Sequence, residues 1–383
     1  MDKHNNNSII ISGGGTGGHI FPAISIANAL KAIEPGLDIL FVGAQGRMEM
    51  EKVPSAGYAI VGLPVMGFNR KNPFKNITVI IKLLQSTRLA YKIIKQHNPA
   101  VVVGVGGYAS GPILRTASKM HIPSLIQEQN SYAGITNRLL AKKVNKICVA
   151  YDGMDKYFPA DKIIFTGNPV RQDLDNIGGK TQEAYQYFQL QPNRKTILVL
   201  GGSLGARTLN ESILNDIDKI AASDIQVIWQ TGAGYFDEIN KKVGSRQMPN
   251  VKVHSFISRM DLAYAAADLV ISRAGAGTIS ELCLTGKAAI LVPSPNVAED
   301  HQTKNATALI DKNAASMVRD AEAFEKLSDL ALTMIHNETM LKTLSTNVSK
   351  MAKHNSAKQI AEEILKLRLI STSAQAEMKD KVT

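Results

Sequence analysis

Cysteine is rare in this chain of 383 residues, which contains only Cys148 and Cys283. Both lie in apolar stretches far apart in the sequence, which favours buried thiols in a reducing compartment and excludes a disulfide-stabilised secreted fold. Long apolar runs are also missing, because no stretch approaches the roughly 18 residues that a membrane span needs. With no signal-peptide pattern at the N-terminus either, we expect a cytosolic globular protein that meets a membrane only peripherally.

Acidic residues are absent between Glu51 and Glu128, and this segment carries ten basic residues. They are Lys52, Arg70, Lys71, Lys75, Lys82, Arg88, Lys92, Lys95, Arg115 and Lys119. Because the net charge of the whole chain is +11, this segment should face whatever anion the protein meets. Aromatic residues make up only 5% of the chain and no nucleic-acid-binding motif occurs, so we expect no nucleic-acid partner.

Short β-branched runs alternate with helix-forming stretches along the whole chain. The predicted strands are residues 8–11, 38–43, 100–106, 124–128, 146–150, 162–167, 196–202, 225–232, 251–256, 268–275 and 288–295. Their nearly continuous apolar character is typical of strands that helices cover on both faces. The alternation predicts an α/β protein with doubly wound parallel sheets.

The strand pattern stops at a polar passage after Pro169 and then restarts, which predicts two Rossmann-like domains. We place the N-terminal domain at residues 1–170 and the C-terminal domain at 171–357. A last helix, at about 358–370, is expected to pack back on the first domain, followed by a polar tail at 371–383.

The loop "GGGTGGH" after the first predicted strand is rich in glycine. Gly13, Gly15 and Gly18 fit the dinucleotide pattern G-x-G-x-x-G, but no acidic residue ends the second strand to hold a ribose, so a nicotinamide enzyme is the weaker alternative. A P-loop is excluded because His19 stands where its lysine would be. Small residues still let backbone N–H groups approach an anion at a helix N-terminus.

His19 falls in the first turn of the helix that follows this loop. The positive end of the helix dipole disfavours an imidazolium there, so a neutral imidazole that can accept a proton is favoured. A histidine that only caps or packs at the turn is the alternative reading.

Three further segments place polar groups where predicted strands end. "GVGGYASGP" brings Gly106, Gly107, Tyr108 and Ser110, and "QEQN" brings Glu128 and Asn130. Because carboxyl ends of neighbouring parallel strands form a crevice, these groups should lie near the first loop. In the second half, "GGSLGAR" places Ser203 and backbone amides at a helix start that suits a diphosphate.

Thr278 and Glu281 allow two interpretations. They match the T-x-x-E capping box, in which the glutamate only satisfies backbone donors. A carboxylate at this position can equally accept both hydroxyls of a ribose, and the sequence does not choose between them. Farther on, His301 and Gln302 follow the last predicted strand, and the lack of a partner ligand at suitable spacing argues against a metal site.

Seven ordered motifs together resemble the MurG family of N-acetylglucosaminyltransferases. They are "GGTGGHIFPA", "GVGGYASGP", "EQN", "GNPVR", "GGSLGAR", "SRAGAGTISE" and "DHQTKNA". The resemblance implies a GT-B fold of two Rossmann-like domains facing across a cleft. It also implies inverting transfer from UDP-N-acetylglucosamine to the 4-hydroxyl of undecaprenyl-diphospho-N-acetylmuramoyl-pentapeptide (lipid I), forming lipid II. Other readings are a UDP-N-acetylglucosamine 2-epimerase or another lipid glycosyltransferase of the same fold.

The resemblance also suggests roles for individual residues and no cofactor. It implies His19 as the base, with Glu128 as its partner, and Gly14, Gly15, Gly106, Gly107, Tyr108 and Ser110 as loops for the acceptor diphosphate. Donor contacts are implied for Thr16, Gly17, Gly18, Asn130, Arg171, Ser203, Ile257, Ala276, Gly277, Thr278, Glu281 and Gln302. Leu204 departs from the family, where glutamine is common.

A membrane role is expected for the basic stretch 72–95. Ile77, Ile80, Ile81 and Leu84 form one helical stripe that we interpret as the core face of a crossover helix. Val79 and Leu83 then point outward among lysines, so we predict that Lys75, Val79, Lys82 and Leu83 contact an anionic membrane. The family implies the cytoplasmic face of the bacterial cell membrane. Contact with other cell-wall synthesis proteins is left open, because the sequence does not identify protein partners.

Overall fold

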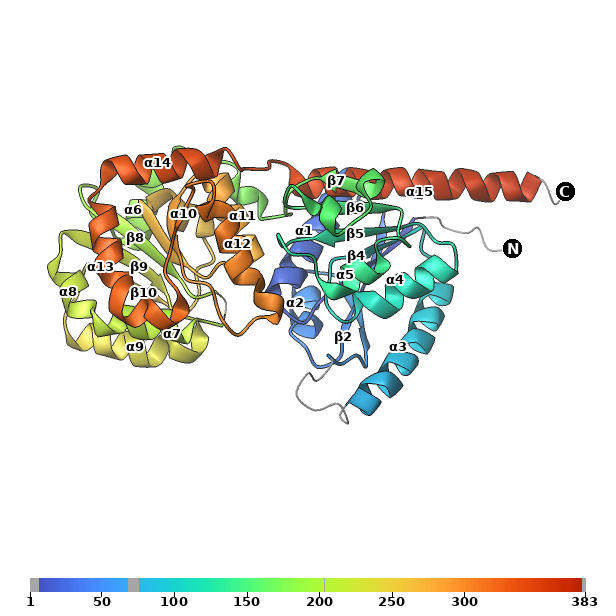
Figure 1. Cartoon of the computed structure of the whole chain (residues 1–383), viewed down its shortest axis with the longest axis horizontal. Coiled ribbons are helices and arrows are strands. Elements are labelled where there is room, and N and C mark those ends of the chain that lie inside the picture. The colour runs from blue at the N-terminus through green and yellow to red at the C-terminus, as the bar shows by residue number, and fades with distance from the viewer. Residues whose placement is uncertain (1–6, 68–75, 203, 381–383) are drawn as a thin grey trace. The chain divides into compact units, whose positions relative to one another are not determined.

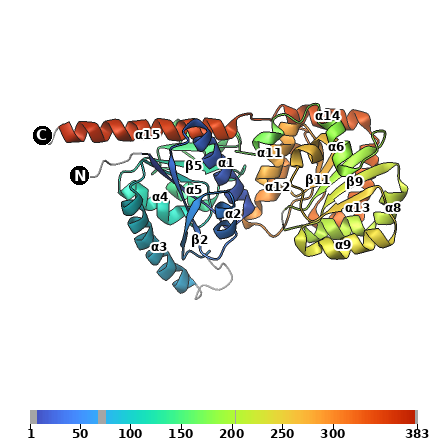
Figure 2. The same ribbon diagram turned by 180° about the vertical axis from the view of Figure 1, so that it is seen from behind.

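The computed structural model of the chain describes residues 7–67, 76–202 and 204–380. Contacts divide it into two compact units, one drawn from Met1–Val170 and Asn355–Thr383 and the other from Arg171–His354 (Figure 1). We call them unit 1 and unit 2 and describe each by itself. In the described residues each unit contains one parallel sheet with helices packed against it (Figures 1 and 2).

The sheet of unit 1 has seven strands among the described residues, in the order β3-β2-β1-β4-β5-β6-β7. Their bounds are Ser8–Ser12 (β1), Asp38–Ala44 (β2), Ala59–Leu63 (β3), Val101–Gly104 (β4), Ser124–Glu128 (β5), Lys146–Val149 (β6) and Ile163–Phe165 (β7). The strand order reverses between β1 and β4, which pair directly with Ile9 beside Val101. In open parallel sheets this switch point is where ligands bind.

Helices of unit 1 cover both faces of its sheet. They are α1 (Gly17–Ile33), α2 (Glu49–Ser55), α3 (Asn76–His97), α4 (Ser110–Lys119), α5 (Ile135–Leu140) and α15 (Ser356–Asp380). Ile9 and Ile11 of β1 face α1 and α15, whereas Ile10 faces the layer of α3, α4 and α5. This alternation along a buried strand gives the unit its two apolar cores.

The helix α15 packs against α1 although more than 300 residues separate them. Ile360, Ala361 and Ile364 are fully buried in the core that α1 shares with the sheet. Arg368 adds a paired contact, since its two terminal nitrogens donate to the carboxylate of Glu34 at 2.7 and 2.6 Å. The sequence predicted a helix that ends near residue 370, whereas α15 continues to Asp380.

The sheet of unit 2 has six strands among the described residues, in the order β10-β9-β8-β11-β12-β13. Their bounds are Lys195–Leu200 (β8), Ile225–Gln230 (β9), Val251–His254 (β10), Leu269–Ser272 (β11), Ala288–Leu291 (β12) and Ser316–Met317 (β13). The switch point lies between β8 and β11. It occupies the same place in the strand order as the β1/β4 switch point of unit 1.

Unit 2 buries a large apolar cluster between its sheet and several helices. The helices of the unit include α6 (Thr181–Phe188), α7 (Arg207–Asn215), α8 (Ile217–Ala222), α9 (Ala233–Ser245), α10 (Met260–Ala266), α11 (Ala276–Thr285), α12 (His301–Ile310), α13 (Ala323–Ile335) and α14 (Glu338–Ser349). Trp229 of β9 is fully buried in this cluster, and its indole N–H donates to Asn210 of α7 at 3.1 Å. A buried tryptophan normally needs such a partner.

All eleven predicted strands are confirmed, although most end one or two residues early. The sequence analysis missed β3 and β13. Three of the five residues of β3 are only partly buried and one is exposed, so this edge strand lacks the continuous apolar signal of the others. The second, β13, is two residues long, too short to form a recognisable pattern.

The predicted core face of α3 is wrong. Val79 is 4% exposed and begins a buried stripe, the Val79 stripe. This stripe continues through Ser86, Ala90 and Ile94, which are fully buried. The residues expected inside are exposed instead: Ile77, Ile80, Ile81 and Leu84. That stripe ends at Leu84, because Arg88 follows on the same side, whereas the Val79 stripe runs the whole length of the helix.

The correction changes the predicted membrane contact. Val79 belongs to the core and cannot touch a membrane, whereas Leu83 is 38% exposed and Lys82 is partly exposed. Lys75 lies outside the described residues. We call the exposed residues Ile77, Ile80, Ile81 and Leu84 the α3 apolar stripe.

Both cysteines are buried and unpaired with each other, as predicted. Burial raises the pKa of each thiol to about 12. The two thiols therefore stay protonated and act as small apolar core groups.

Candidate active site

Two glycine-rich loops meet at the switch point of unit 1, as predicted. One joins β1 to α1 and the other joins β4 to α4. Gly107 has a φ of +85°, and a β-carbon placed there would lie 2.3 Å from the carbonyl oxygen of Gly14. Only glycine lets the two backbones approach this closely.

The carboxylate of Glu49 holds the first loop in place. Glu49 is 1% exposed, and its two oxygens lie 3.1 and 3.0 Å from the backbone nitrogen of Gly15. Its Oε1 also accepts from the backbone N–H of Ala44 at 2.9 Å. Glu49 thus already accepts from the Gly15 N–H, and Gly14 is buried beside the same carboxylate. That this loop meets an acceptor diphosphate stays a prediction.

Ser110 ties the two loops together. It is fully buried, and its hydroxyl oxygen lies 2.7 Å from the carbonyl oxygen of Ser12 and 2.9 Å from that of Gly106. Its single hydroxyl proton is therefore used inside the protein, and the role of this loop toward an acceptor diphosphate stays a prediction. Tyr108 differs, because its side chain is 57% exposed.

His19 is the third residue of α1, in the first helical turn as predicted. Its Nδ1 lies 3.0 Å from Oε1 of Gln129, which follows β5. Gly106 has a φ of +96°, and a β-carbon there would lie 2.8 Å from Cε1 of the imidazole. The ring is thus held between the second glycine loop and the Gln129 amide, and it remains partly exposed.

Gln129 belongs to a buried amide network. Its Nε2 donates to the carbonyl oxygen of Val105 at 2.7 Å and contacts Oε1 of Gln127. Gln127 in turn donates to Oδ1 of Asn168 at 3.0 Å, and Nδ2 of Asn168 donates back to the carbonyl oxygen of Gln129 at 3.0 Å. All three amide side chains are at least 95% buried, so the network is rigidly placed.

Glu128 organises the loop after β5. It is 1% exposed, and its carboxylate accepts from the backbone and side chain of Asn130 at 3.1 and 3.3 Å. It also accepts from the Gly134 backbone at 3.0 Å and from Nδ2 of Asn137 at 2.8 Å. Four hydrogen-bond donors therefore surround the Glu128 carboxylate. The residue that contacts the His19 ring is Gln129, which was not predicted from the sequence.

The start of α1 is open to the surroundings. Thr16 is its N-cap residue, and Gly17 and Gly18 are its first two residues. Thr16 and Gly18 are exposed and Gly17 is partly exposed. Backbone N–H groups of a first helical turn have no partner inside the helix, so this end suits an anion or sugar hydroxyls.

In unit 2, the loop between β8 and α7 has an open glycine. Around Gly202, whose φ is +81°, no atom lies within 4 Å of a built β-carbon. Leu204 is 74% exposed, and α7 begins at Arg207, as the sequence predicted for a helix start. Ser203 lies outside the described residues.

The helix α11 starts at Ala276, directly after the carboxyl end of β11. Its N-cap residue is Gly275, so Thr278 lies inside the helix and the capping-box interpretation of Thr278 and Glu281 is wrong. Gly277 borders open space. The N-terminus of a ten-residue helix at a switch point is suited to a phosphate or sugar.

Glu281 points its carboxylate at Tyr264 of α10. The buried Tyr264 hydroxyl donates to Oε2 of Glu281 at 2.9 Å. Burial raises the pKa of Glu281, opposed by the positive charge of Arg171 and by the Tyr264 hydrogen bond. Arg171 therefore lies within electrostatic reach of Glu281, and the two predicted donor-binding residues belong to one cluster.

Two other residues that were predicted to contact the UDP-sugar make hydrogen bonds that involve the backbone of unit 2. Ile257 is 3% exposed, and its backbone N–H donates to Oε1 of Gln230 at 2.8 Å. Gln302, the second residue of α12, accepts at Oε1 from the backbone N–H of Ser294 at 2.8 Å. The side chain of Gln302 thereby fixes the loop after β12.

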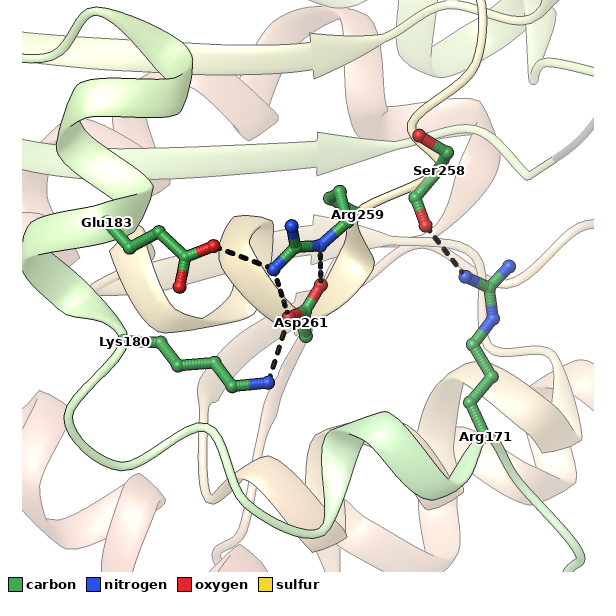
Figure 3. Close-up of polar contacts among 6 residues, drawn as sticks. All are labelled: Arg171, Lys180, Glu183, Ser258, Arg259 and Asp261. Carbon is green, nitrogen blue, oxygen red and sulfur yellow. Dashed lines mark hydrogen bonds and ion pairs between the residues drawn. The ribbon is translucent and has the colours of Figure 1, made fainter.

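An ionic cluster anchors the segment that follows Ile257 (Figure 3). Asp261 is 2% exposed and accepts from Arg259 and from Lys180, each at 2.9 Å. The hydrogen bonds from Arg259 hold the pKa of Asp261 well below its usual range, with help from Lys180. Arg171 approaches the same segment, since its Nη1 lies 3.4 Å from the carbonyl oxygen of Ser258.

Three residues that contact predicted site residues were not themselves predicted from the sequence: Glu49, Gln129 and Tyr264. Each acts through a contact with a residue distant in the chain, and Glu49 lies 34 positions from the amide that it holds. Gln129 stood between two selected residues of the "QEQN" motif, so the motif itself was the available signal. In the described part of the chain, none of the helices has the length and apolar character needed to cross a membrane.

Comparisons with known proteins cover almost the whole chain. The model of the glycosyltransferase family 28 N-terminal domain matches residues 9–149, and that of the family 28 C-terminal domain matches residues 196–364. The chain is 60% identical to a protein of Parabacteroides distasonis, over 94% of this chain and 98% of that protein. That relative is named UDP-N-acetylglucosamine--N-acetylmuramyl-(pentapeptide) pyrophosphoryl-undecaprenol N-acetylglucosamine transferase.

Solved structures agree with the fold prediction. The crystal structure of Acinetobacter baumannii MurG matches with a TM-score of 0.75 and 28% identity, covering 94% of this chain and 99% of that one. A UDP-GlcNAc 2-epimerase from Neisseria meningitidis bound to UDP-GlcNAc matches with a TM-score of 0.62 and 15% identity, covering 94% and 99% of the two chains. At that identity the epimerase shares the fold alone.

Proposed function

Because the chain belongs to the MurG family of glycosyltransferases, which transfers N-acetylglucosamine from UDP-N-acetylglucosamine to lipid I to form lipid II, we propose that His19 is the general base of this transfer. In a single inverting displacement, the 4-hydroxyl of the muramoyl sugar attacks the anomeric carbon opposite the UDP. The hydroxyl proton passes to the His19 imidazole, a new carbon–oxygen bond forms, and the bonding electrons of the broken bond leave with UDP.

The observation that carries this proposal is the placement of His19. Its ring stands at the switch point of unit 1, is held by Gln129 and Gly106, and stays partly exposed. Glu128 is not needed as a second base, because its carboxylate is already surrounded by donors from its own loop. Gly107 and Tyr108, at the outer side of the second glycine loop, are the parts of that loop that we assign to the acceptor.

We assign the nucleotide to unit 2. Glu281 would accept the ribose hydroxyls, and the first turn of α11 would face the donor through Ala276, Gly277 and Thr278. The leaving diphosphate needs positive character, which Arg171 and the start of α7 supply. Ile257 and Gln302 shape the surrounding loops. Thr16, Gly17, Gly18 and Asn130 would contribute to the sugar from unit 1.

The direct test separates transfer from epimerisation. Purified protein would be incubated with UDP-N-acetylglucosamine, with and without a short-chain lipid I analogue, and UDP and UDP-sugars would be quantified. We expect UDP and a β-linked disaccharide only when the acceptor is present. Formation of the 2-epimer without acceptor, or absence of UDP release with it, would contradict the proposed activity.

We also propose that the α3 apolar stripe docks on an anionic membrane, which carries the lipid acceptor. Ile77, Ile80, Ile81 and Leu84 are 51–61% exposed, an arrangement that is costly in water without a partner surface. Exposed Arg88, Lys92 and Lys95 follow on the same helix. Each basic residue near an anionic bilayer contributes about 1 kcal/mol.

A pair of serine substitutions tests the docking. Ile80→Ser combined with Leu84→Ser should weaken binding to vesicles that contain anionic lipid, as measured by co-sedimentation, with turnover of a water-soluble acceptor retained. Phe324→Ser is the matched control, because Phe324 is 52% exposed but lies on α13 of unit 2. Equal vesicle binding by the double variant and the wild type would contradict the docking role.

A further inference from the structure

A chain of hydrogen bonds links the backbone of Val105, the Gln129 side chain and the His19 imidazole. The starting point is the carbonyl oxygen of Val105, which can only accept. It lies 2.7 Å from Nε2 of Gln129, so this atom must be the amide nitrogen. Val105 is itself fixed, since its backbone N–H donates to the carbonyl oxygen of Ser12 in β1 at 2.8 Å.

The orientation of the Gln129 amide then decides the role of its oxygen. With the nitrogen turned toward Val105, Oε1 faces the imidazole, 3.0 Å from Nδ1. An amide oxygen is an acceptor and has no proton to give, so Nδ1 of His19 must be the donor. In a neutral imidazole with its proton on Nδ1, the lone pair that can accept a proton is on Nε2.

Burial makes this arrangement hard to reverse. Gln129 is 1% exposed and Gln127 is fully buried, so water cannot replace a lost partner. Turning the Gln129 amide over would place its oxygen against the Val105 carbonyl and its NH2 group against Nδ1. It would also leave buried acceptors without donors, each at a cost of about 1–3 kcal/mol.

We propose that Gln129 is a positioning residue that holds His19 as the Nδ1–H tautomer and presents Nε2 as the base for the acceptor hydroxyl. This inference rests on the proposed role of His19 and adds the residue that orients it. Gln129 has no contact with the reacting atoms in this assignment. Its effect passes through the imidazole, as the orienting carboxylate acts in hydrolase triads, but without a charge.

Nitrogen NMR tests the tautomer without any substrate. The protein would be labelled with 15N in its eight histidines and studied at a pH where the imidazole is neutral, with His19 identified by the signal lost in His19→Ala. We expect a protonated Nδ1 and an unprotonated Nε2 in the wild type. A proton on Nε2 in the wild type would overturn the proposal.

Matched variants separate positioning from folding. Gln129→Met should change the His19 nitrogen pattern and lower kcat about 10- to 100-fold without a matching rise in the KM for UDP-N-acetylglucosamine. Gln127→Met is the control, because it removes a buried amide from the same network and leaves the Gln129 contact to His19. Equal losses in the two variants, or an unchanged tautomer in Gln129→Met, would contradict a specific role for Gln129.

A charged substitute gives an independent signature. In Gln129→Glu one carboxylate oxygen can still accept from Nδ1–H, whereas the other replaces the nitrogen that donates to Val105, so the signature is the pH profile and not the size of kcat. The negative charge also favours the imidazolium, so a higher pH is needed to obtain the neutral base and the acid limb of the kcat profile should move upward. An acid limb at the wild-type position would contradict the contact between residue 129 and the base.

These outcomes distinguish the two proposals. If His19→Ala retains wild-type kcat, the role of His19 as base fails, although the tautomer found by NMR can still be the one inferred. If His19→Ala is inactive but Nε2 carries the proton in the wild type, the role of Gln129 fails alone.

Discussion

The two units share one strand order around their switch points but differ in what fills the loops there. In unit 1 the β1–α1 and β4–α4 loops are locked by buried polar groups, with Glu49 on the Gly15 amide and Ser110 on two carbonyl oxygens. In unit 2 the β8–α7 loop is also packed at Gly205, where a β-carbon would lie 2.2 Å from the carbonyl oxygen of Thr231, but Gly202 of this loop and Gly277 at the start of α11 border open space. Both units thus have tightly packed glycine turns, and unit 1 adds the buried contacts of Glu49 and Ser110 to the loops beside His19.

This difference fits the separate roles that we propose for the two units, with the base in unit 1 and the nucleotide in unit 2. A proton acceptor must be held in one orientation, and the locked loops of unit 1 do this for His19 through Gln129 and Gly106. A diphosphate and a ribose are suited to a helix N-terminus and a carboxylate, which the start of α11 and Glu281 offer.

The largest effect is expected at His19. His19→Ala removes the proposed base and should lower kcat about 10²- to 10⁴-fold, the usual contribution of general base catalysis. Release of UDP in the presence of a lipid I analogue measures it. A loss of less than about tenfold would mean that another group takes the proton.

Glu49→Gln should loosen the locked loops. The amide keeps one acceptor oxygen, so one of the buried backbone contacts to Gly15 and Ala44 is weakened, and the free energy of unfolding should fall by about 1–3 kcal/mol. Thermal melting measures the change. Glu51→Gln is the control on the same helix, because the Glu51 side chain is 76% exposed; an equal shift in both would refute the loop-locking role of Glu49.

A smaller effect is expected from pH at Glu281. Burial raises its pKa above the ordinary glutamate value of about 4.3, so on acidification it loses its charge at a higher pH than an ordinary glutamate does. The Kd for UDP should therefore rise as the pH falls through this raised pKa, and it should be flatter over the same range in Glu281→Gln. Parallel pH profiles of the two proteins would show that another group is responsible.

The fold was accessible from sequence because buried parallel strands leave continuous apolar runs. All eleven runs became strands, whereas the short β13 and the partly buried β3 had no such signal. The face of α3 was misjudged for a related reason. Its exposed stripe is as apolar as its buried one over the first two turns, and only Ala90, Ile93 and Ile94 farther along show which face continues into the core.

The site was accessible only in part. His19, Glu281 and the glycine loops stand out because residue type and position in a motif suggest chemistry. The internal contacts of Glu128, Ser110 and Gly15 depend on partners such as Gly134, Gly106 and Glu49, which local patterns do not reveal. Motifs therefore located the loops, and three-dimensional contacts decided which groups are used inside the protein.

Calorimetric titration of UDP into the wild type, His19→Ala and Glu281→Gln tests the division between the units most directly. The account predicts that His19→Ala binds UDP with the wild-type Kd and that Glu281→Gln binds it about 10- to 100-fold more weakly, as expected for loss of charge-assisted hydrogen bonds. The opposite pattern, with UDP binding lost in His19→Ala and kept in Glu281→Gln, would place the nucleotide in unit 1 and contradict the account.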